Sequence, residues 1–338
     1  MGAARSRVHR DAVRRRPFLP PGERAISLRT LRGTLARVTV PLLAGLLAAC
    51  SEAPKERAPA AAPAAIRIVD DAGDTVALAA PARRIVSLNP ASTELLFAVG
   101  AGPALVGRSQ WCDWPAEAAR LPSLGDAISP SLEAIVARRP DLVVLYPSGQ
   151  NAAAARRLRS LGIAVAQLRT DLVSDVPRLA PVLGALAGRR TAGDSLARAF
   201  EAELDAITED TPAPGDARPT VFLLVWDQPP MTVGRGSFLT ELIERAGGRN
   251  VFADLASSAA AISIEAVTAR DPDLVLVTSE GDPSFARRPE WASVPAVRER
   301  RFVRITGSQF NRPGPRVPAA VRELAGKLRA AHVAGGRP

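Results

Sequence analysis

Short apolar runs alternate with longer stretches of helical spacing along most of the chain. The apolar runs lie at residues 85–88, 142–145, 221–225 and 274–277. Apolar runs of this length are typical of strands that are buried on both faces of a sheet. Because predicted helices separate these strands, the pattern predicts an α/β fold with mainly parallel sheets.

One helix–strand unit occurs twice. Residues 131–145 read SLEAIVARRPDLVVL and residues 263–277 read SIEAVTARDPDLVLV, and nine of these fifteen positions are identical. A second related pair precedes these units in the same order: residues 93–102 read TELLFAVGAG and residues 240–248 read TELIERAGG. Two related pairs in one order predict two similar lobes.

The repeated unit has the features of a capped helix followed by a strand. Ser131 and Ser263 suit the N-cap position. Glu133 and Glu265 then fall in the first helical turn, where the helix dipole favours a negative charge. A Pro-Asp pair ends each helix. The dipole alone explains a single such glutamate, but two matched acids on matched lobes also suit a partner with two matched sites.

A longer amphipathic helix is predicted between the lobes. Four apolar residues recur at helical spacing within residues 191–208: Leu196, Phe200, Leu204 and Ile207. A helix of this length spans ~27 Å. The Pro-containing segment 211–215 ends it. The sequence therefore predicts two lobes joined by one long rigid helix, with a ligand cleft between the lobes.

The net charge is concentrated at the N-terminus. The 338 residues are enough for two domains, and the formal net charge is +10. Residues 1–49 hold ten arginines and two acids, and so carry +8 of this charge. A nucleic-acid-binding protein should carry its positive charge on the folded domain. We therefore expect no nucleic-acid partner.

A short apolar segment follows these arginines. Residues 38–49 are uncharged and follow Arg37. The run is too short for a membrane-spanning helix, which needs ~20 residues, but it suits the core of a signal peptide. It ends in Leu47-Ala48-Ala49-Cys50, which resembles a bacterial lipobox and predicts lipidation of Cys50. A buried apolar helix that ends in cysteine is the alternative.

The segment after Cys50 is rich in Ala and Pro and predicts an extended tether. If Cys50 carries lipid, Cys112 has no disulfide partner. We then expect Cys112 to be a small buried hydrophobic residue.

Residues for common enzyme sites are scarce. The two histidines, His9 and His332, lie outside the centres of the predicted lobes. A His-ligated metal site or a Ser-His-Asp triad is therefore nearly excluded. A metalloenzyme or nitrogenase-like α/β domain would need a Cys or His cluster, which the sequence lacks. We expect a protein without catalytic residues, metal ligands or a covalently bound cofactor.

Aromatic residues are few, so their positions are informative. Tyr146 and Trp226 directly follow apolar runs, which places them at the carboxyl ends of strands, where α/β sheets bind ligands. Trp111 and Trp114 lie on either side of Cys112-Asp113. Planar side chains of this kind can line a cleft for a flat, partly apolar ligand. Packing inside the lobes is the alternative, and we favour it for Trp114.

Several of these segments together resemble one protein family. Residues 84–95 read RIVSLNPASTEL and are similar to the opening of cobalamin-binding and ferric-siderophore-binding proteins of ABC importers. Residues 111–115, WCDWP, resemble the loop that follows in the cobalamin branch, and residues 131–143 continue the match. Residues 310–316, FNRPGPR, are similar to the last cleft segment of that family.

The resemblance implies a substrate-binding lipoprotein with two α/β lobes bridged by a rigid helix. The implied partners are the permease dimer and ATPase subunits of an ABC importer, with Glu133 and Glu265 docking onto permease arginines. The implied ligand is a corrinoid such as cobalamin, or another metal chelate. Its implied contacts are Trp111, Tyr146, Trp226, Phe310 and Arg312.

The predicted organisation follows from these signals. It comprises a lipoprotein signal peptide (1–49), a lipid-anchored tether (50–80), an N-terminal α/β lobe (81–170), a bridging helical segment (171–215) and a C-terminal α/β lobe (216–334). The expected location is the periplasm or the cell-envelope surface, with a lipid anchor in the membrane.

The ligand is less sharply indicated than the family. Cobalamin binders of the family often carry aromatic residues just before the two paired glutamates, whereas residues 125–128 and 257–262 carry none. An iron-siderophore or haem chelate is the alternative ligand, although the lack of cleft histidines and the single tyrosine argue against direct iron ligation. A surface adhesion lipoprotein is a further alternative, but it would need neither paired glutamates nor a cleft.

Overall fold

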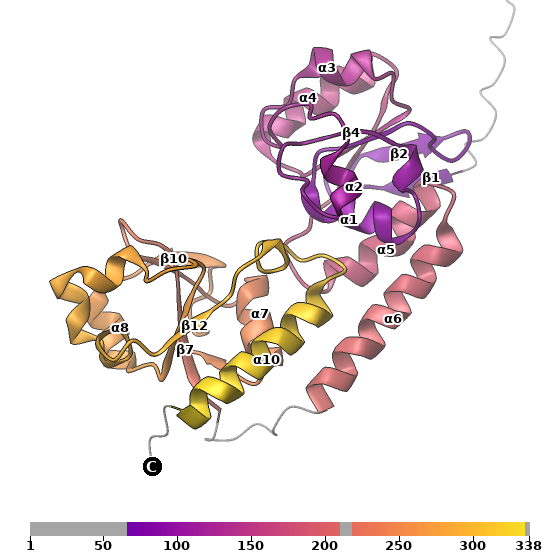
Figure 1. The fold of residues 1–338 in the computed structure, drawn as a ribbon. Coiled ribbons are helices and arrows are strands. Elements are labelled where there is room, and N and C mark those ends of the chain that lie inside the picture. Colours follow the sequence, from indigo (N-terminus) through magenta and orange to yellow (C-terminus); the bar gives the residue numbers. More distant parts are fainter. Residues whose placement is uncertain (1–65, 210–217, 335–338) are drawn as a thin grey trace, which may run out of the picture. The chain divides into compact units, whose positions relative to one another are not determined.

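The computed structural model describes residues 66–209 and 218–334, which form two α/β lobes and the helices that connect them (Figure 1). The predicted signal peptide, Cys50 and the first part of the predicted tether lie outside the described residues. Within the described ranges, no helix is both long and apolar enough to cross a membrane. The two lobes confirm the predicted α/β class.

The N-terminal lobe is built on four parallel strands in the order β4–β3–β5–β6. Their bounds are Ile85–Ser87 (β3), Leu105–Arg108 (β4), Leu142–Leu145 (β5) and Ala164–Gln167 (β6). All of β3 and β5 is buried, as their apolar runs predict. The helices are α1 (Pro90–Ala98), α2 (Ala116–Ala119), α3 (Leu132–Ala137), α4 (Gly149–Ser160) and α5 (Asp175–Leu186), with a 3-10 turn at Gly102–Ala104.

The end of the predicted tether is folded. β1 (Ile66–Val69) and β2 (Thr75–Leu78) form an antiparallel hairpin, and alternate residues of β2 are buried. Asp70 begins the turn and is 5% exposed. Its carboxylate accepts a hydrogen bond from the Gln167 backbone N–H at 3.0 Å and pairs with Arg159 at 3.1 Å. The predicted tether boundary at residue 80 is therefore wrong, because the hairpin packs and pairs within the N-terminal lobe.

The C-terminal lobe contains a mixed sheet in the order β10–β8–β7–β11–β12, with β9 paired to β7. The pairs that join β7, β9, β11 and β12 are parallel, whereas the β7–β8 and β8–β10 pairs are antiparallel. The strands are β7 (Thr220–Trp226), β8 (Met231–Val233), β9 (Arg249–Asn250), β10 (Ala259–Ala261), β11 (Leu274–Val277) and β12 (Phe302–Arg304). The helices are α7 (Phe238–Arg245), α8 (Ile264–Arg270), α9 (Pro295–Arg298) and α10 (Val317–Ala334), with 3-10 turns at Ser284–Arg287, Pro289–Ser293 and Ser308–Phe310.

The repeated sequence unit forms the same local structure in both lobes. The hydroxyl of Ser131 accepts a hydrogen bond from the Ala134 backbone N–H at 3.3 Å, and Ser263 accepts one from Ala266 at 3.2 Å. α3 and α8 begin at the next residue in each case, and both lead to a strand that is buried throughout. The predicted N-caps, helices and buried strands are confirmed.

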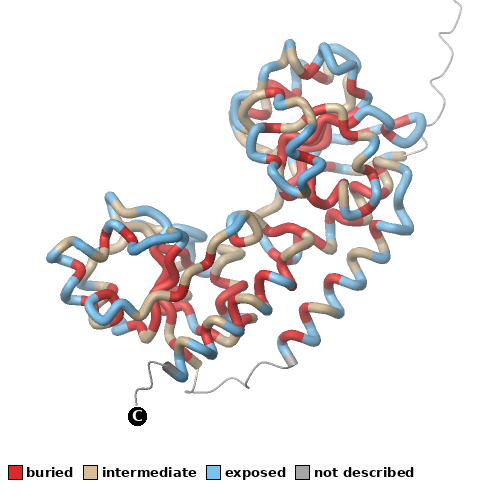
Figure 2. Tube along the Cα trace, viewed as in Figure 1, coloured by how far each residue is buried: buried red, intermediate tan, exposed pale blue. Residues whose placement is uncertain are grey.

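The predicted long helix is α6 (Arg190–Glu209), which has 20 residues and spans about 30 Å. It packs against α5 and α10. Phe200, Leu204 and Ile207 are buried in an apolar cluster that also includes strand residues of both lobes. In Figure 2 the strands inside each lobe are buried, while much of α6 faces solvent. The amphipathic spacing therefore predicts this helix to within one residue at each end.

Candidate ligand-binding site

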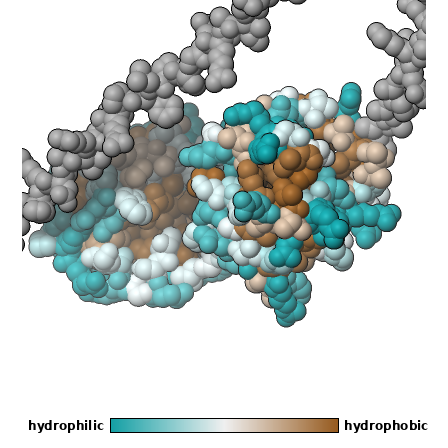
Figure 3. Space-filling view, turned by 90° about the horizontal axis from the view of Figure 1, so that it is seen from above, coloured by the Kyte–Doolittle hydropathy of each residue, from teal (hydrophilic) through white to brown (hydrophobic). Residues whose placement is uncertain are grey.

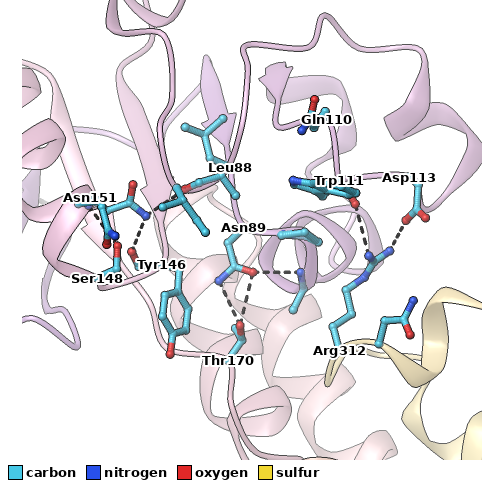
Figure 4. Close-up of a pocket in the computed structure, with 16 residues that line it drawn as sticks. Leu88, Asn89, Gln110, Trp111, Asp113, Tyr146, Ser148, Asn151, Thr170 and Arg312 are labelled. Atoms are coloured by element: carbon cyan, nitrogen blue, oxygen red, sulfur yellow. Dashed lines mark hydrogen bonds and ion pairs between the residues drawn. The ribbon is translucent and has the colours of Figure 1, made fainter. Parts of the chain in front are cut away.

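A cavity of about 660 Å³ lies at the carboxyl edge of the N-terminal sheet (Figure 4). Its walls come from the segments that follow β3, β4, β5 and β6, together with Asn311 and Arg312 from the end of the C-terminal lobe. Strands of a parallel sheet point the same way, so their carboxyl ends meet at one edge, where α/β sheets bind ligands. The volume is within the usual range for a small-molecule site.

Trp111 forms one wall of the cavity. It is 57% exposed, and its indole Nε1–H donates to Asp126 Oδ2 at 3.1 Å. Gln110 Nε2 donates to the same oxygen, and the backbone N–H of Ile128 donates to Asp126 Oδ1 at 2.8 Å. The Ile128 N–H, followed by the Trp111 indole, lowers the pKa of Asp126 below its ordinary value. Asp126 therefore stays ionised at neutral pH and holds the indole in place.

Tyr146 lies directly after β5 on another wall. Its hydroxyl donates to Asp171 Oδ1 at 2.8 Å. Burial, followed by the Asp171 carboxylate, raises the pKa of Tyr146 above its ordinary value. Asn151 Nδ2 donates to the backbone oxygens of Tyr146 at 2.9 Å and Ala127 at 3.0 Å, which ties two walls together.

Asn89 supports the floor of the cavity. Its Oδ1 accepts from the Ala91 backbone N–H at 3.1 Å and caps α1. Its Nδ2 donates to the Leu168 backbone oxygen at 3.2 Å and to the Thr170 hydroxyl at 3.1 Å. One side chain thus joins the segments that follow β3 and β6.

Arg312 brings a charge to the cavity, but this charge is already paired. Arg312 Nε donates to Glu94 Oε1 at 2.7 Å, and Nη1 donates to the Trp111 backbone oxygen at 3.3 Å. Its Nη2 donates to the Asp113 carboxylate. Burial opposes the charge on the guanidinium, but the two carboxylates outweigh burial and raise the pKa of Arg312.

The predicted ligand residues do not all lie at one place. Trp111, Tyr146 and Arg312 line the same cavity. Trp226 ends β7 and is 62% exposed, and it lines a separate depression of about 260 Å³ on the C-terminal lobe. Phe310 is 2% exposed within the apolar core, so its ring packs inside the protein and does not line the cavity. Ligand contact by Trp226 or Phe310 stays a prediction.

The expectation that Trp114 packs in the core is wrong. Trp114 is 47% exposed, and the guanidinium of Arg316 lies 4.7 Å from the centre of its ring. Its neighbour Cys112 is fully buried with a free thiol, as predicted. The Cys112 sulfur accepts a hydrogen bond from the Thr93 hydroxyl at 3.1 Å.

The two matched glutamates lie in exposed first turns, Glu133 in α3 and Glu265 in α8. The backbone N–H of Glu265, followed by the hydroxyl of Ser263, lowers the pKa of Glu265. Neither glutamate forms an ion pair with another residue of the described ranges. Both carboxylates are therefore available to an external partner.

Sequence reasoning missed the polar residues that hold the aromatic walls. These are Asn89, Gln110, Asp126, Asn151 and Asp171. Asn89 had a local signal, because it stands before Pro90-Ala91 in an N-cap position. Each of the others has at least one partner that is distant in the chain, such as Tyr146 for Asp171, which is 25 positions away. In the described part of the chain, no three His, Cys, Asp or Glu side chains are grouped so that they could hold a metal ion.

The fold and the cavity define a two-lobed α/β protein that binds a ligand. The chain belongs to the periplasmic binding protein family, whose model matches residues 85–308.

Two relatives of this chain are named as vitamin B12-binding proteins. A vitamin B12-binding protein of Salmonella typhimurium is 30% identical over 247 residues, which are 73% of this chain and 90% of the relative. One of Vibrio parahaemolyticus is 29% identical over 72% of this chain and 88% of the relative.

Solved structures give the same picture. The periplasmic vitamin B12-binding protein BtuF of Vibrio cholerae is 26% identical and superposes with a TM-score of 0.63, covering 75% of this chain and 98% of its own. The periplasmic haem-binding protein RhuT of Roseiflexus sp. RS-1 is 26% identical, with a TM-score of 0.66, and covers 74% of this chain and 98% of its own. Vitamin B12 and haem are both metal complexes of a tetrapyrrole-derived macrocycle.

Proposed function

We propose that this protein captures a corrinoid such as cobalamin in the cavity and delivers it to an ABC importer. The curated relatives named for vitamin B12 support the ligand class. The protein acts as a carrier and not as an enzyme, and the ligand is held without a covalent bond.

The observation that carries this proposal is the chemistry of the cavity wall. Among the described residues that line it, Arg312 is the only cation, and Glu94 and Asp113 already pair with it. The remaining polar groups are neutral amides and hydroxyls: Asn89, Gln110, Tyr146, Ser148, Gln150, Asn151, Thr170 and Asn311. A corrin ring bears neutral amide side chains that can exchange hydrogen bonds with such groups. The two carboxylates of haem would find no free cation there.

An iron-siderophore or haem chelate is the second candidate ligand. The structural likeness to the haem-binding RhuT favours it. Trp111 could stack on the macrocycle of either haem or a corrinoid. Haem carries two carboxylates whereas cyanocobalamin is neutral overall, so the salt dependence of binding can separate these two ligands.

Purified protein should be titrated with cyanocobalamin, haemin and a ferric hydroxamate, with tryptophan fluorescence and the ligand's absorption spectrum as readouts. We expect saturable binding of one cyanocobalamin with quenching of fluorescence. Its affinity should change little with salt, because a neutral ligand meets a paired arginine. Saturable binding of haemin without binding of cyanocobalamin would establish the second candidate instead.

We also propose export and lipidation at Cys50, on the strength of Leu47-Ala48-Ala49-Cys50 after an apolar run. The protein would then act in the periplasm or on the envelope surface. Cys50→Ala should leave an unprocessed precursor that incorporates no labelled fatty acid in cells, whereas Cys112→Ala should be processed normally. Labelling of the Cys50 variant would refute the assignment.

The proposed partner is a two-fold permease with its ATPase subunits. Glu133 and Glu265 would each meet arginines on one permease subunit. The exposed surface near α3 suits a protein contact, because Val136, one turn after Glu133, is 38% exposed. Figure 3 displays apolar side chains gathered into a patch with a polar border on the N-terminal lobe. A patch of this composition is typical of interaction surfaces.

A further inference from the structure

A buried carboxylate of the N-terminal lobe holds two arginines from the end of the C-terminal lobe. Glu94 on α1 is 2% exposed. Its Oε1 accepts hydrogen bonds from Arg312 Nε at 2.7 Å and from Arg316 Nη2 at 2.6 Å. Its Oε2 accepts from Arg316 Nε at 2.8 Å. Gly314 lies between the arginines in sequence and against this carboxylate, since an added β-carbon would stand 3.0 Å from Oε2.

The same two arginines continue to the loop that carries Trp111. Arg312 donates to the backbone oxygen of Trp111 at 3.3 Å and to the carboxylate of Asp113 (Figure 4). Arg316 lies over the ring of Trp114, where a guanidinium is attracted to the indole face. One carboxylate is thus connected, through one arginine each, to both ends of the loop 111–114.

The equivalent glutamate of the second repeat is neither buried nor bound to two distant arginines. Glu241 occupies the equivalent position in α7, as the matching TEL sequences show. It pairs with Arg245, four residues later on the same helix, at 3.0 Å, and its side chain is 31% exposed. Glu94 instead reaches partners 218 and 222 residues away. The burial of Glu94 is therefore specific to the lobe that carries the cavity.

Stability gives little reason for such a network. Burying charges costs desolvation energy, and apolar residues of similar volume often stabilise a protein as well as a buried ion pair does. A carboxylate that forms a bidentate contact with an arginine does fix geometry, because planar groups meet in few orientations.

We propose that Glu94 is a positioning residue of the ligand site. It fixes Arg312 and Arg316, and through them it holds the loop 111–114 so that Trp111 faces the cavity. The proposal rests on the proposed function in taking this cavity as the ligand site. The loop is preorganised in the free protein, so the ligand does not bear the entropic cost of ordering it.

The test is Glu94→Gln, which keeps the size of the side chain but removes the charge that balances two arginines. The dissociation constant for cyanocobalamin should rise about tenfold or more, the loss expected when a charge-assisted hydrogen bond is removed. The indole N–H signals of Trp111 and Trp114 in NMR spectra of the ligand-free protein should also shift. Glu241→Gln is the matched control and should change neither the affinity nor these signals.

Gly314→Ala provides a second variant, because it displaces the Glu94 carboxylate without removing a charge. It should shift the same indole signals and weaken binding in the same direction. Wild-type affinity and unshifted indole signals in a folded Glu94→Gln protein would overturn the proposal, as would an equal loss in Glu241→Gln. If the wild-type protein binds no cyanocobalamin, the proposed function fails, but the indole signals still test the positioning role.

Discussion

The two lobes share one end of their repeated unit and differ at the other. At the helical end, Ser131 and Ser263 cap their helices alike, and each leaves a glutamate exposed in the first turn. At the carboxyl end of the strands the lobes have diverged. The N-terminal lobe forms a cavity of about 660 Å³, whereas the depression beside Trp226 holds about 260 Å³.

The difference agrees with what the proposed two-fold partner and the proposed single ligand would each require. A partner with two identical sites requires the same residue at the same place in both lobes. A single asymmetric ligand places no such demand, so the ends of the strands are free to differ. Glu94 and Glu241 illustrate this divergence, since identical local sequences are buried in one lobe and half-exposed in the other.

Charge reversal at the matched glutamates tests the feature that the two lobes share. The double change Glu133→Arg and Glu265→Arg should reduce ligand uptake by cells to background, because it would place like charges at both proposed contacts with the permease. Each single change should have a smaller effect. Ligand affinity of the free protein should stay unchanged, since neither residue lines the cavity.

Glu117→Arg is the control for this experiment. Glu117 is also exposed in the first turn of a helix, α2, but it has no matching glutamate in the other repeat. Its uptake should equal that of the wild type. Normal uptake by the double variant would leave the two glutamates as charges that merely suit helix dipoles.

Removal of one tryptophan from each lobe, in separate variants, tests the difference between the lobes at the carboxyl ends of their strands. Trp111→Ala should weaken ligand binding by about 1–3 kcal/mol, the usual scale for an aromatic anchor. Trp226→Ala should cost less, because Trp226 lines the smaller depression and not the cavity. Isothermal titration of the two variants beside the wild type measures both losses. Equal losses would mean that one ligand contacts both lobes, as expected if Trp111 and Trp226 line one cleft between the lobes.

The predictable features of the fold are those that short segments encode. The Ser131 and Ser263 caps, the buried strands after them and α6 each depend on residues within about one or two helical turns. The hairpin 66–78 was missed although Ile66, Ile68, Val76 and Leu78 alternate with polar residues in part, because four-residue strands resemble an irregular tether.

The site was harder to predict because its contacts join distant residues. The sequence indicated Trp111 and Tyr146, since their neighbours mark the ends of strands or a loop. It gave no sign that Arg316 would cover Trp114, or that Phe310 would turn into the core. Such pairings depend on the packing of complete lobes, which no local pattern encodes.

The smallest effect concerns the environment of Tyr146. It is the only tyrosine of the chain, so the near-ultraviolet absorbance of phenolate reports on this group alone. Burial, followed by Asp171, raises the pKa of Tyr146, so Tyr146 should ionise at higher pH in the folded protein than in the denatured protein.

The stabilisation linked to the neutral phenol of Tyr146 is then fully present below the denatured-state pKa and is lost as the pH rises through the folded-state pKa. Asp171→Asn should move the folded-state midpoint part of the way down, because burial remains, whereas Asp227→Asn, beside Trp226 on the other lobe, should leave it in place. Identical ionisation midpoints of Tyr146 in the folded and denatured protein would show that its hydroxyl is as solvated in the fold as in the denatured chain. The two lobes would then differ at their strand ends in cavity shape alone.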